Sequence, residues 1–321
     1  MDKKQKIIKT ITTSIAVLIF LTGLIIALYP TISNLYGKYV DSKLMTEYDI
    51  ESTKISNDNK STILDEAVKY NKDLINKNNG MVVTAMQNKE YAEKDNIEEY
   101  NTYNNMLKNS SSSIMCTINI PKIAVTVPVY HWSTDDVLNK GIGHIHGSSL
   151  PVGCGVDPED PKFSKITGSR SLFIGHRGLP SLKLFSDLDK VDIGDVFYVK
   201  TLGDIYAYKV CNIDIVLPED VENLKIEPGR DLCTLITCTP YGVNTHRILV
   251  TGERIPYKGE SIEADTITKI TNSIDPITIF GVIFIVFLLI LVIIIKRPKR
   301  HKKESVKGDD NIEVEITSDN P

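Results

Sequence analysis

Apolar positions along the chain follow three kinds of pattern, and these divide it into segments. Two long and almost purely apolar runs lie near the ends, at Ile15–Tyr29 and Ile277–Ile295. Between them, apolar residues recur at helical spacing from Ser61 to Lys77, which predicts an amphipathic helix. From residue 114 the pattern changes to short apolar runs separated by Gly, Pro, Asn and Asp, which predicts β-strands.

The strand pattern recurs throughout the second half of the chain. We expect strands over Ile114–Ile120, Val125–Tyr130, Gly143–His146, Ser171–Ile174, Gly194–Val199, Ile205–Leu217, Leu232–Cys238 and His246–Arg254. Short helices are expected before Leu138 and over Leu182–Leu188, whereas residues 30–60 show no clear period. Many short strands with turns between them predict an all-β barrel or sandwich.

The two apolar runs have the length and the flanks of membrane spans. The first run is preceded by Lys3, Lys4, Lys6 and Lys9, reaches 23 residues when counted from Ile7, and shows no small-residue cleavage pattern, so it predicts an uncleaved anchor. The second precedes a cluster of six Lys and Arg residues in 296–303, which predicts a cytoplasmic flank. Both termini are then expected inside, with residues of about 30 to 275 outside; the alternative, a buried helix of a soluble protein, fits the polyaliphatic run poorly.

Net charge and cysteine count limit the classes of function that the chain can have. The net charge of −4 gives no indication of nucleic-acid binding. Five cysteines in an exported domain leave at least one free thiol, and their spacings match no zinc motif. Two disulfides among the remaining four are an alternative, but the spacings do not resemble a disulfide-rich mini-domain.

A predicted hairpin contains the most suggestive residues. Leu232–Cys238 and His246–Val250 flank a turn containing Pro and Gly. Because side chains alternate along a strand, Cys238 lies on the opposite face from Cys233, and Arg247 on the opposite face from His246. A thiolate nucleophile needs a nearby base and a cationic group for the oxyanion. Taken singly, however, a cysteine at a strand end is usually a small core residue.

A histidine ends another apolar strand. His176 follows Ser171–Ile174 and is flanked by Gly175 and Gly178, so little backbone crowding is expected around it. An imidazole near Cys238 could act as a base and then as an acid towards a leaving amine. By alternation, Arg177 should point away from the cleft and make a surface or loop contact.

Two ordered motifs resemble the sortases, membrane-bound cysteine transpeptidases of Gram-positive surfaces. They are Thr-Leu-Ile-Thr-Cys-Thr-Pro-Tyr-Gly at 234–242 and Asn-Thr-His-Arg-Ile-Leu-Val-Thr-Gly at 244–252. Further segments resemble class C, the pilus-assembling branch. These are Ile-Asn-Ile-Pro-Lys-Ile at 118–123, Gly-His at 143–144, Gly-Ser-Ser-Leu-Pro-Val-Gly at 147–153, Gly-His-Arg-Gly-Leu-Pro at 175–180 and Lys-Leu-Phe-Ser-Asp-Leu at 183–188.

The resemblance implies an eight-stranded sortase β-barrel, preceded by a helical segment and flanked by two transmembrane helices. It implies that Cys238 is the nucleophile that forms a thioacyl intermediate, His176 the general acid and base, and Arg247 the residue that stabilises substrate and oxyanion. The implied reaction cleaves a signal similar to Leu-Pro-x-Thr-Gly and passes the acyl group to a pilin lysine. The implied partners are pilin or surface proteins with such a signal and the lipid bilayer; neither nucleic acid nor a cofactor is expected.

Two alternatives to the pilus function are a sortase that anchors proteins to cell-wall peptide amines and a catalytically silent, membrane-tethered pilin scaffold. Class C enzymes usually carry a lid with an Asp-Pro-aromatic motif, which residues 30–113 lack. A lid is therefore absent, uses another aromatic such as Tyr91 or Tyr103, or is replaced by the loop at 148–167.

Two histidines suggest a metal site as an alternative. His144 and His146 lie two apart and could form half a metal site with Cys154, but a structural role for His144 is favoured and no metal is expected. The predicted segments are 1–29 (cytoplasmic end and first span), 30–113 (helical segment or lid), 114–257 (catalytic barrel), 258–275 (linker), 276–296 (second span) and 297–321 (cytoplasmic tail).

Overall fold

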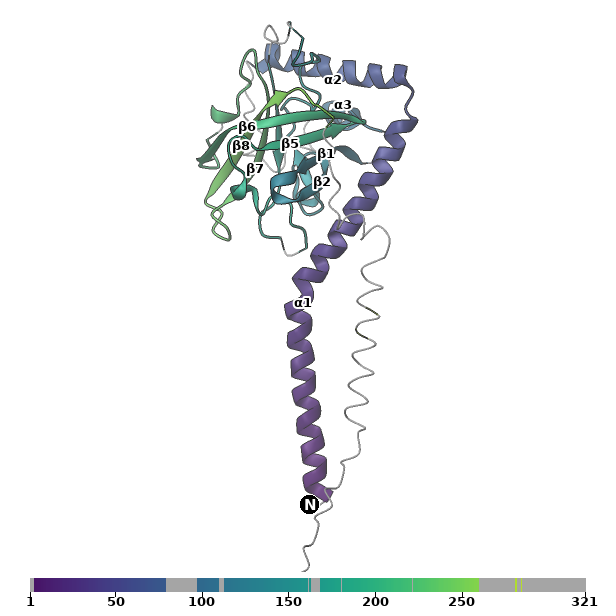
Figure 1. Cartoon of the computed structure of the whole chain (residues 1–321), viewed down its shortest axis with the longest axis vertical. Coiled ribbons are helices and arrows are strands. Elements are labelled where there is room, and N and C mark those ends of the chain that lie inside the picture. The colour runs from purple at the N-terminus through teal and green to yellow at the C-terminus, as the bar shows by residue number, and fades with distance from the viewer. Residues whose placement is uncertain are drawn as a thin grey trace, which may run out of the picture. The chain divides into compact units, whose positions relative to one another are not determined.

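The computed structural model describes residues 3–78, 97–109, 113–160, 162, 168–179, 181–220, 222–259, 281 and 284. The chain separates into two units, residues 1–277 and 278–321. The first unit contains all the helices and strands discussed below (Figure 1). The predicted second span, at Ile277–Ile295, lies outside the described residues except for positions 281 and 284.

A closed barrel of eight strands forms the body of the first unit (Figure 1). The strands are β1 (Ile114–Ile120), β2 (Val125–His131), β3 (Ile142–His144), β4 (Ser169–Ile174), β5 (Val196–Thr201), β6 (Asp204–Val216), β7 (Asp231–Thr239) and β8 (His246–Ile255). Their order around the barrel is β1-β2-β3-β4-β7-β8-β6-β5. The pairs β2–β3 and β4–β7 are parallel and the other pairs antiparallel. The eight-stranded barrel expected from the sequence is confirmed.

Strand directions give the barrel two distinct ends. β1, β4, β6 and β7 finish at the end where β2, β3, β5 and β8 begin. We call this the hairpin end, because it carries the β7–β8 turn at residues 240–245. The opposite end carries the β5–β6 turn at 202–203 and His144, the last residue of β3.

Alternation along β7 separates two apolar clusters. Cys233 and Leu235 face the barrel interior and belong to the main core. Ile236 lies on the outer face and packs with Leu172 and Leu249 in a second, smaller cluster. Because the period of a strand is two, Cys238 shares the outer face with Ile236.

Three helices precede the barrel: α1 (Lys3–Lys54), α2 (Asn57–Asn78) and α3 (Ile97–Asn105). The predicted helix at Ser61–Lys77 is confirmed as part of α2. Residues 30–60 show no clear period in the sequence, yet α1 continues through them to Lys54. Its barrel-facing side includes three buried polar residues, Asp41, Ser42 and Ser52. A face that mixes polar and apolar side chains leaves no clear hydrophobic period.

Contacts with both ends of the barrel hold α1 in place. The Tyr48 hydroxyl donates to the Met115 carbonyl at 2.9 Å and accepts from the Leu202 amide at 2.8 Å, so one side chain joins α1 to β1 and to the β5–β6 turn. Near the hairpin end, a Cβ on Gly37 would lie 2.4 Å from Leu182 Cδ2 and 2.8 Å from the Ser181 carbonyl. α1 therefore packs directly on the segment that follows β4.

The segment after β3 packs beneath α2. The Asn71 amide donates to the carbonyls of Leu150 and Gly153, at 3.0 and 2.8 Å, and its oxygen accepts from the Leu150 amide at 2.7 Å. Gly155 lies against Val68, whose side chain would be 2.8 Å from an added Cβ. The described part of the 148–167 loop is thus attached to α2.

The helix predicted over Leu182–Leu188 is not formed. These residues make turns, followed by a 3-10 helix, η3, at Leu188–Lys190. The Lys183 ammonium donates to the Ile123 carbonyl at 2.6 Å and pairs with Asp187 at 2.9 Å. Leu184, Phe185 and Leu188 are buried. Their spacing resembles that of a helix, but here two successive turns bury these side chains.

The first half of α1 differs from the rest of the described chain in its exposed apolar surface. Within the described residues, one helix is long and apolar enough to cross a membrane; it covers Ile7–Lys54, and its most apolar 18-residue window has a mean hydropathy of 2.5 and no buried residue. The apolar run predicted as an anchor is therefore helical and does not pack on the barrel.

Candidate active site

Cys238 and Arg247 face each other across the last two strands. In the antiparallel register of β7 and β8 they are direct partners. Directly opposed residues on adjacent strands present their side chains on the same face, with Cβ atoms about 4.5–5.5 Å apart. The thiol and the guanidinium therefore project from one position of the sheet, as strand alternation predicts.

His176 reaches the same position from the other side of β7. The parallel register of β4 and β7 pairs Ile174 with Ile236, so His176 is level with Cys238, two residues further along each chain. The pairing extends beyond the strand, because the Gly175 amide donates to the Ile236 carbonyl at 3.1 Å and the Thr237 hydroxyl donates to the Gly175 carbonyl at 2.7 Å.

The three residues consequently form a row across β4, β7 and β8, which we call the cross-strand row. Adjacent strands are about 4.8 Å apart, so Cys238 lies one strand spacing from His176 and one from Arg247. The thiol is between the imidazole and the guanidinium. Side chains from β7, β8 and the segment that follows β4 are thereby brought together at the hairpin end of the barrel.

Burial distinguishes Cys238 from the other thiols. All five cysteines are free thiols, and Cys238 and Cys211 are half-buried whereas the other three are buried. Burial raises the pKa of Cys116 and Cys233 well above the ordinary value and raises that of Cys154 to about 11. A protonated, inaccessible thiol is a poor nucleophile, so two candidates remain.

Cys211 has a different setting from Cys238. Its thiol donates to the Thr251 carbonyl at 3.4 Å and lies 3.6 Å from Arg230 Nη2. It sits at a bulge of β6 opposite the middle of β8, away from the hairpin end that carries His176. Register therefore favours Cys238 as the reactive thiol.

The turn between β7 and β8 holds the Arg247 guanidinium. Nη1 donates to the carbonyls of Asn244 and His246 at 3.2 and 3.1 Å. Asn244 adopts a left-handed conformation, with φ of 62°, which Asn tolerates better than most residues. Within the described residues, Arg247 Nε and Nη2 have no protein hydrogen-bond partner, so these donors can address a substrate oxygen.

Arg177 makes the loop contact that its position in the sequence predicts. Its side chain is only 7 % exposed and pairs with Asp189 at 2.7 Å. Its Nη1 donates to the Thr239 hydroxyl at 3.1 Å, and the guanidinium lies 5.8 Å from the centre of the Tyr241 ring. Arg177 therefore joins the loop of His176 to the loop of Cys238. The sequence gives no signal for Asp189 and Thr239 as its partners, because the contacts depend on the path of the chain after β4.

A buried apolar cluster adjoins the row on the outer face of the barrel. Ile236 is two residues before Cys238 and packs with the other members of the second cluster: Ile145, Leu172, Val216, Leu224 and Leu249. Leu224 comes from the β6–β7 segment. The Arg170 guanidinium holds this segment by donating to the Asn223 carbonyl at 3.0 Å and to Glu227 at 2.6 Å.

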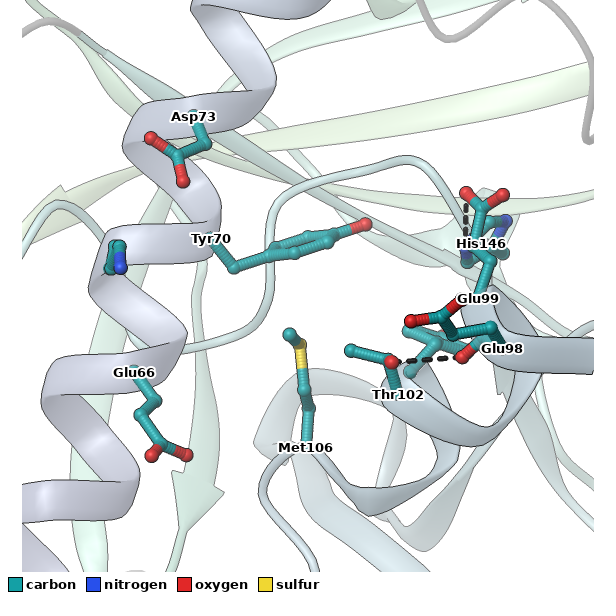
Figure 2. Close-up of a pocket in the computed structure, with 10 residues that line it drawn as sticks. Glu66, Tyr70, Asp73, Glu98, Glu99, Thr102, Met106 and His146 are labelled. Carbon is teal, nitrogen blue, oxygen red and sulfur yellow. Dashed lines mark hydrogen bonds and ion pairs between the residues drawn. The ribbon is translucent and has the colours of Figure 1, made fainter.

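A cavity of about 650 Å³ lies between α2, α3 and His146, but at the opposite end of the barrel from Cys238. In Figure 2, Glu66 and Asp73 come from α2, Glu98 and Glu99 from α3, and Tyr70 extends from α2 between them. Because none of the cross-strand row lines it, the register and the accessible thiol locate the candidate active site better than cavity size does.

His144 is a structural residue. Its Nε2 lies 2.9 Å from the Ser149 carbonyl and its Nδ1 lies 2.6 Å from the Tyr103 hydroxyl. Because a carbonyl only accepts, Nε2 carries the proton and Nδ1 accepts from Tyr103. Burial lowers the pKa of His144 to about 3. Cys154, proposed as a partner in a metal site, is instead buried near Asp231.

The structure bears on two of the candidate lids, Tyr103 and the loop at 148–167. Tyr103 is 1 % exposed and bonded to His144 at the end opposite Cys238, so it does not cover the row. The described part of the 148–167 loop is attached to α2 through Asn71. Tyr91 lies outside the described residues.

Comparison with known proteins gives consistent similarities. Residues 118–255 match the model of the sortase domain. The structure is similar to sortase C1 from Streptococcus agalactiae, at 38% identity and a TM-score of 0.55, covering 67% of this chain and 98% of that chain. It is also similar to sortase C-1 from Actinomyces oris, at 36% identity and a TM-score of 0.52, covering 61% of this chain and 98% of that one.

A curated relative matches over a shorter part of its length. Sortase A of Streptococcus agalactiae serotype III (strain NEM316) is 29% identical over 164 residues, which are 49% of this chain and 59% of that protein. The match thus spans less than two thirds of this relative. The matched region of the family model contains His176, Cys238 and Arg247.

Proposed function

The chain belongs to the sortases, a family of cysteine transpeptidases, and on this premise we propose that it cleaves a sorting signal similar to Leu-Pro-x-Thr-Gly and transfers the acyl group to an amine. The observation that carries the proposal is the cross-strand row, in which the Cys238 thiol lies between His176 and Arg247. Nucleophile, proton carrier and oxyanion donor then act on one carbonyl.

In the first half-reaction, the Cys238 thiolate attacks the threonine carbonyl carbon of the signal. Arg247 stabilises the oxyanion through its remaining guanidinium donors, since only Nη1 bonds the turn. The C–N bond then breaks, and the His176 imidazolium gives its proton to the departing glycine amine. A thioester on Cys238 remains.

In the second half-reaction, an incoming amine attacks this thioester. His176 takes the proton that the amine releases, the C–S bond breaks, and Cys238 returns as thiolate. The new amide contains the threonine carbonyl and the nitrogen of the acceptor. The buried apolar cluster that contains Ile236 and Leu172 holds β7 against β4 next to the reacting residues.

We propose a pilin lysine as the acceptor, because the structural neighbours include class C sortases. The alternative acceptor is the amine of a cell-wall peptide. A catalytically silent pilin scaffold is the non-enzymatic alternative, and the accessible Cys238 within an intact row argues against it.

We further propose that two helices anchor the protein in the cell membrane, with both termini cytoplasmic and the barrel outside. The exposed apolar half of α1 supports the first span. The apolar run at Ile277–Ile295 and the basic residues after it support the second.

A transfer assay with the full-length protein in lipid nanodiscs tests the proposal. The sorting peptide is incubated with either a lysine-containing pilin or a wall-peptide amine, and the products are identified by mass spectrometry. Transfer to the pilin lysine supports the pilus function. Transfer to the wall amine alone would instead support the function of anchoring proteins to the cell wall. Failure of a thiol-directed sorting-signal analogue to label Cys238 would favour the scaffold.

A further inference from the structure

The hairpin end of the barrel contains both the cross-strand row and the lower contact with α1. Strand directions place the ends of β4 and β7 there together. The segment after β4 carries His176 and then reaches α1 at Ser181 and Leu182, where Gly37 leaves no room for a Cβ. α1 thus extends past the end of the barrel that carries Cys238.

The apolar half of α1 begins a short distance from this contact. Its apolar run ends at Tyr29, eight residues before Gly37. At 1.5 Å per residue, the segment between them is about 12 Å long. Side chains of the run are exposed, whereas most of those from Ile32 to Val40 are half-buried. The loop of His176 therefore lies near the end of the predicted membrane span.

Large apolar side chains are exposed at the same end. Tyr241 and Val243, in the β7–β8 turn, are 62% and 65% exposed, and Ile193, before β5, is 69% exposed. The Tyr241 ring packs on Gly178 of the His176 loop, 3.0 Å from where a Cβ would be. Single exposed apolar residues are ordinary, but these three project from the end that faces the apolar half of α1.

Charges at the hairpin end largely cancel. Lys122 pairs with Asp192 at 3.0 Å, and Lys183 and Lys190 pair with Asp187 at 2.9 and 2.7 Å. A surface without a basic excess gains little from anionic lipid. Any contact with a bilayer would therefore come from apolar and aromatic side chains, and tyrosine is a residue that the membrane interface favours.

We infer that the hairpin end faces the bilayer, with Tyr241 and Val243 at the lipid interface and the cross-strand row at the end of the barrel nearest the membrane. The occupant of this surface is the lipid interface itself. The inference rests on the proposed function only in taking α1 as a membrane span and Cys238 as the nucleophile.

Fluorescence quenching by brominated lipid tests the orientation. The protein has one tryptophan, Trp132, which follows β2 at the end away from the hairpin. Full-length wild type and Val243→Trp are placed in phosphatidylcholine vesicles with and without brominated chains. We expect Trp132 emission to be unchanged and the added emission of Val243→Trp to fall by about half or more, in high and low salt alike. Equal emission of Val243→Trp in both lipids would overturn the inference.

A change in the length of α1 tests the consequence for activity. Seven alanine-rich residues inserted between Tyr29 and Pro30 lengthen the helix by about 10 Å and turn it by about 700°, only 20° short of two turns. The substrates are a sorting peptide joined by a short linker to an apolar membrane anchor and the same peptide in solution. We expect transfer from the anchored peptide to fall about tenfold or more, because the short linker no longer reaches, while the soluble peptide reacts within about twofold of wild type.

Equal rates of the inserted and wild-type proteins on the anchored peptide would contradict the inference. If wild type transfers neither peptide, the proposed function fails instead, and the quenching of Val243→Trp still decides the orientation. Quenching of Val243→Trp that persists after the insertion would also count against a hairpin end held by α1.

Discussion

Cys238 and Arg247 are direct partners in the antiparallel register of β7 and β8. The backbone pairing of two strands, rather than a flexible loop, therefore sets where the guanidinium lies relative to the thiol. Nη1 is further held by the carbonyls of Asn244 and His246. A residue positioned in this way is preorganised for an oxyanion that forms only during the reaction.

Replacing Arg247 by lysine should therefore damage catalysis more than binding. A lysine keeps the charge but lacks the planar fork, so it cannot both bond the turn and reach the oxyanion. We expect kcat to fall by about 100-fold, with a smaller change in KM. The measurement is steady-state transfer of a sorting peptide, with Arg230→Lys, in an ion pair on the same barrel, as the matched control. A kcat of Arg247→Lys within about threefold of wild type would contradict the proposed role.

The ion pair of Arg177 and Asp189 should position His176. The guanidinium joins the loops that follow β4 and β7, so its loss allows His176 and Cys238 to separate. We expect Arg177→Met and Asp189→Asn each to lower kcat by about tenfold to 100-fold at nearly constant KM. In a double-mutant cycle, the loss of kcat in the double variant should be smaller than the product of the two single losses. Lys200→Met, which breaks an ion pair between β5 and α1, is the control, and equal losses in all three variants would indicate a general loss of stability.

Tyr48 should contribute to the attachment of α1 to the barrel. Its hydroxyl bonds the Met115 carbonyl and the Leu202 amide in a fully buried site. Tyr48→Phe leaves both backbone groups unpaired, which costs about 1–3 kcal/mol for each group that water cannot reach. Thermal unfolding of the full-length protein in micelles should show a lower midpoint, whereas Tyr36→Phe, at an exposed site of the same helix, should not. Equal midpoints would show that water replaces the hydroxyl.

Acid should destabilise the fold through His144. Burial lowers its folded pKa to about 3, whereas an unfolded histidine titrates near its ordinary value of about 6.5. Between these two values the unfolded chain binds the additional proton, so the free energy of unfolding decreases as the pH falls from about 6.5 towards about 3. One such group contributes a slope of about 1.4 kcal/mol per pH unit.

Replacing His144 by glutamine tests this slope. Glutamine retains one donor and one acceptor for Ser149 and Tyr103 but does not titrate. We expect the acid limb of the unfolding free energy to be shallower in His144→Gln than in wild type. His131 serves as the comparison, because burial lowers its pKa to about 4 and its slope should persist in the variant. An unchanged acid limb would contradict a neutral, buried His144.

Periodicity predicted the barrel better than the helices that surround it. Strands such as Leu232–Cys238 are short apolar runs bounded by turn residues, and the structure confirms them nearly to their ends. The continuation of α1 beyond Pro30 has no clear period because the side facing the barrel includes buried Asp41 and Ser42. The helix expected at Leu182–Leu188 failed for the opposite reason, since turns bury its apolar residues equally well.

At the candidate site, alternation separated residues that are neighbours in the sequence. It distinguished Cys238 from Cys233, which the structure places in the main core, and Arg247 from His246. Alternation could not show that His176 is level with Cys238. That relation depends on the parallel register of β4 and β7, which are far apart in the sequence. Pairs such as Arg177 and Asp189 depend on loop conformation and have no sequence signal.

The sulfur that carries the acyl group distinguishes Cys238 from the other accessible thiol most directly. Full-length protein in nanodiscs is mixed with a sorting peptide in the absence of an acceptor amine, quenched in acid, digested and analysed by mass spectrometry. We predict a threonine-linked thioester on Cys238 alone, with no adduct on the half-buried thiol of Cys211, and loss of the adduct in Cys238→Ala but not in Cys211→Ala. An adduct on Cys211, or transfer that persists in Cys238→Ala, would contradict it.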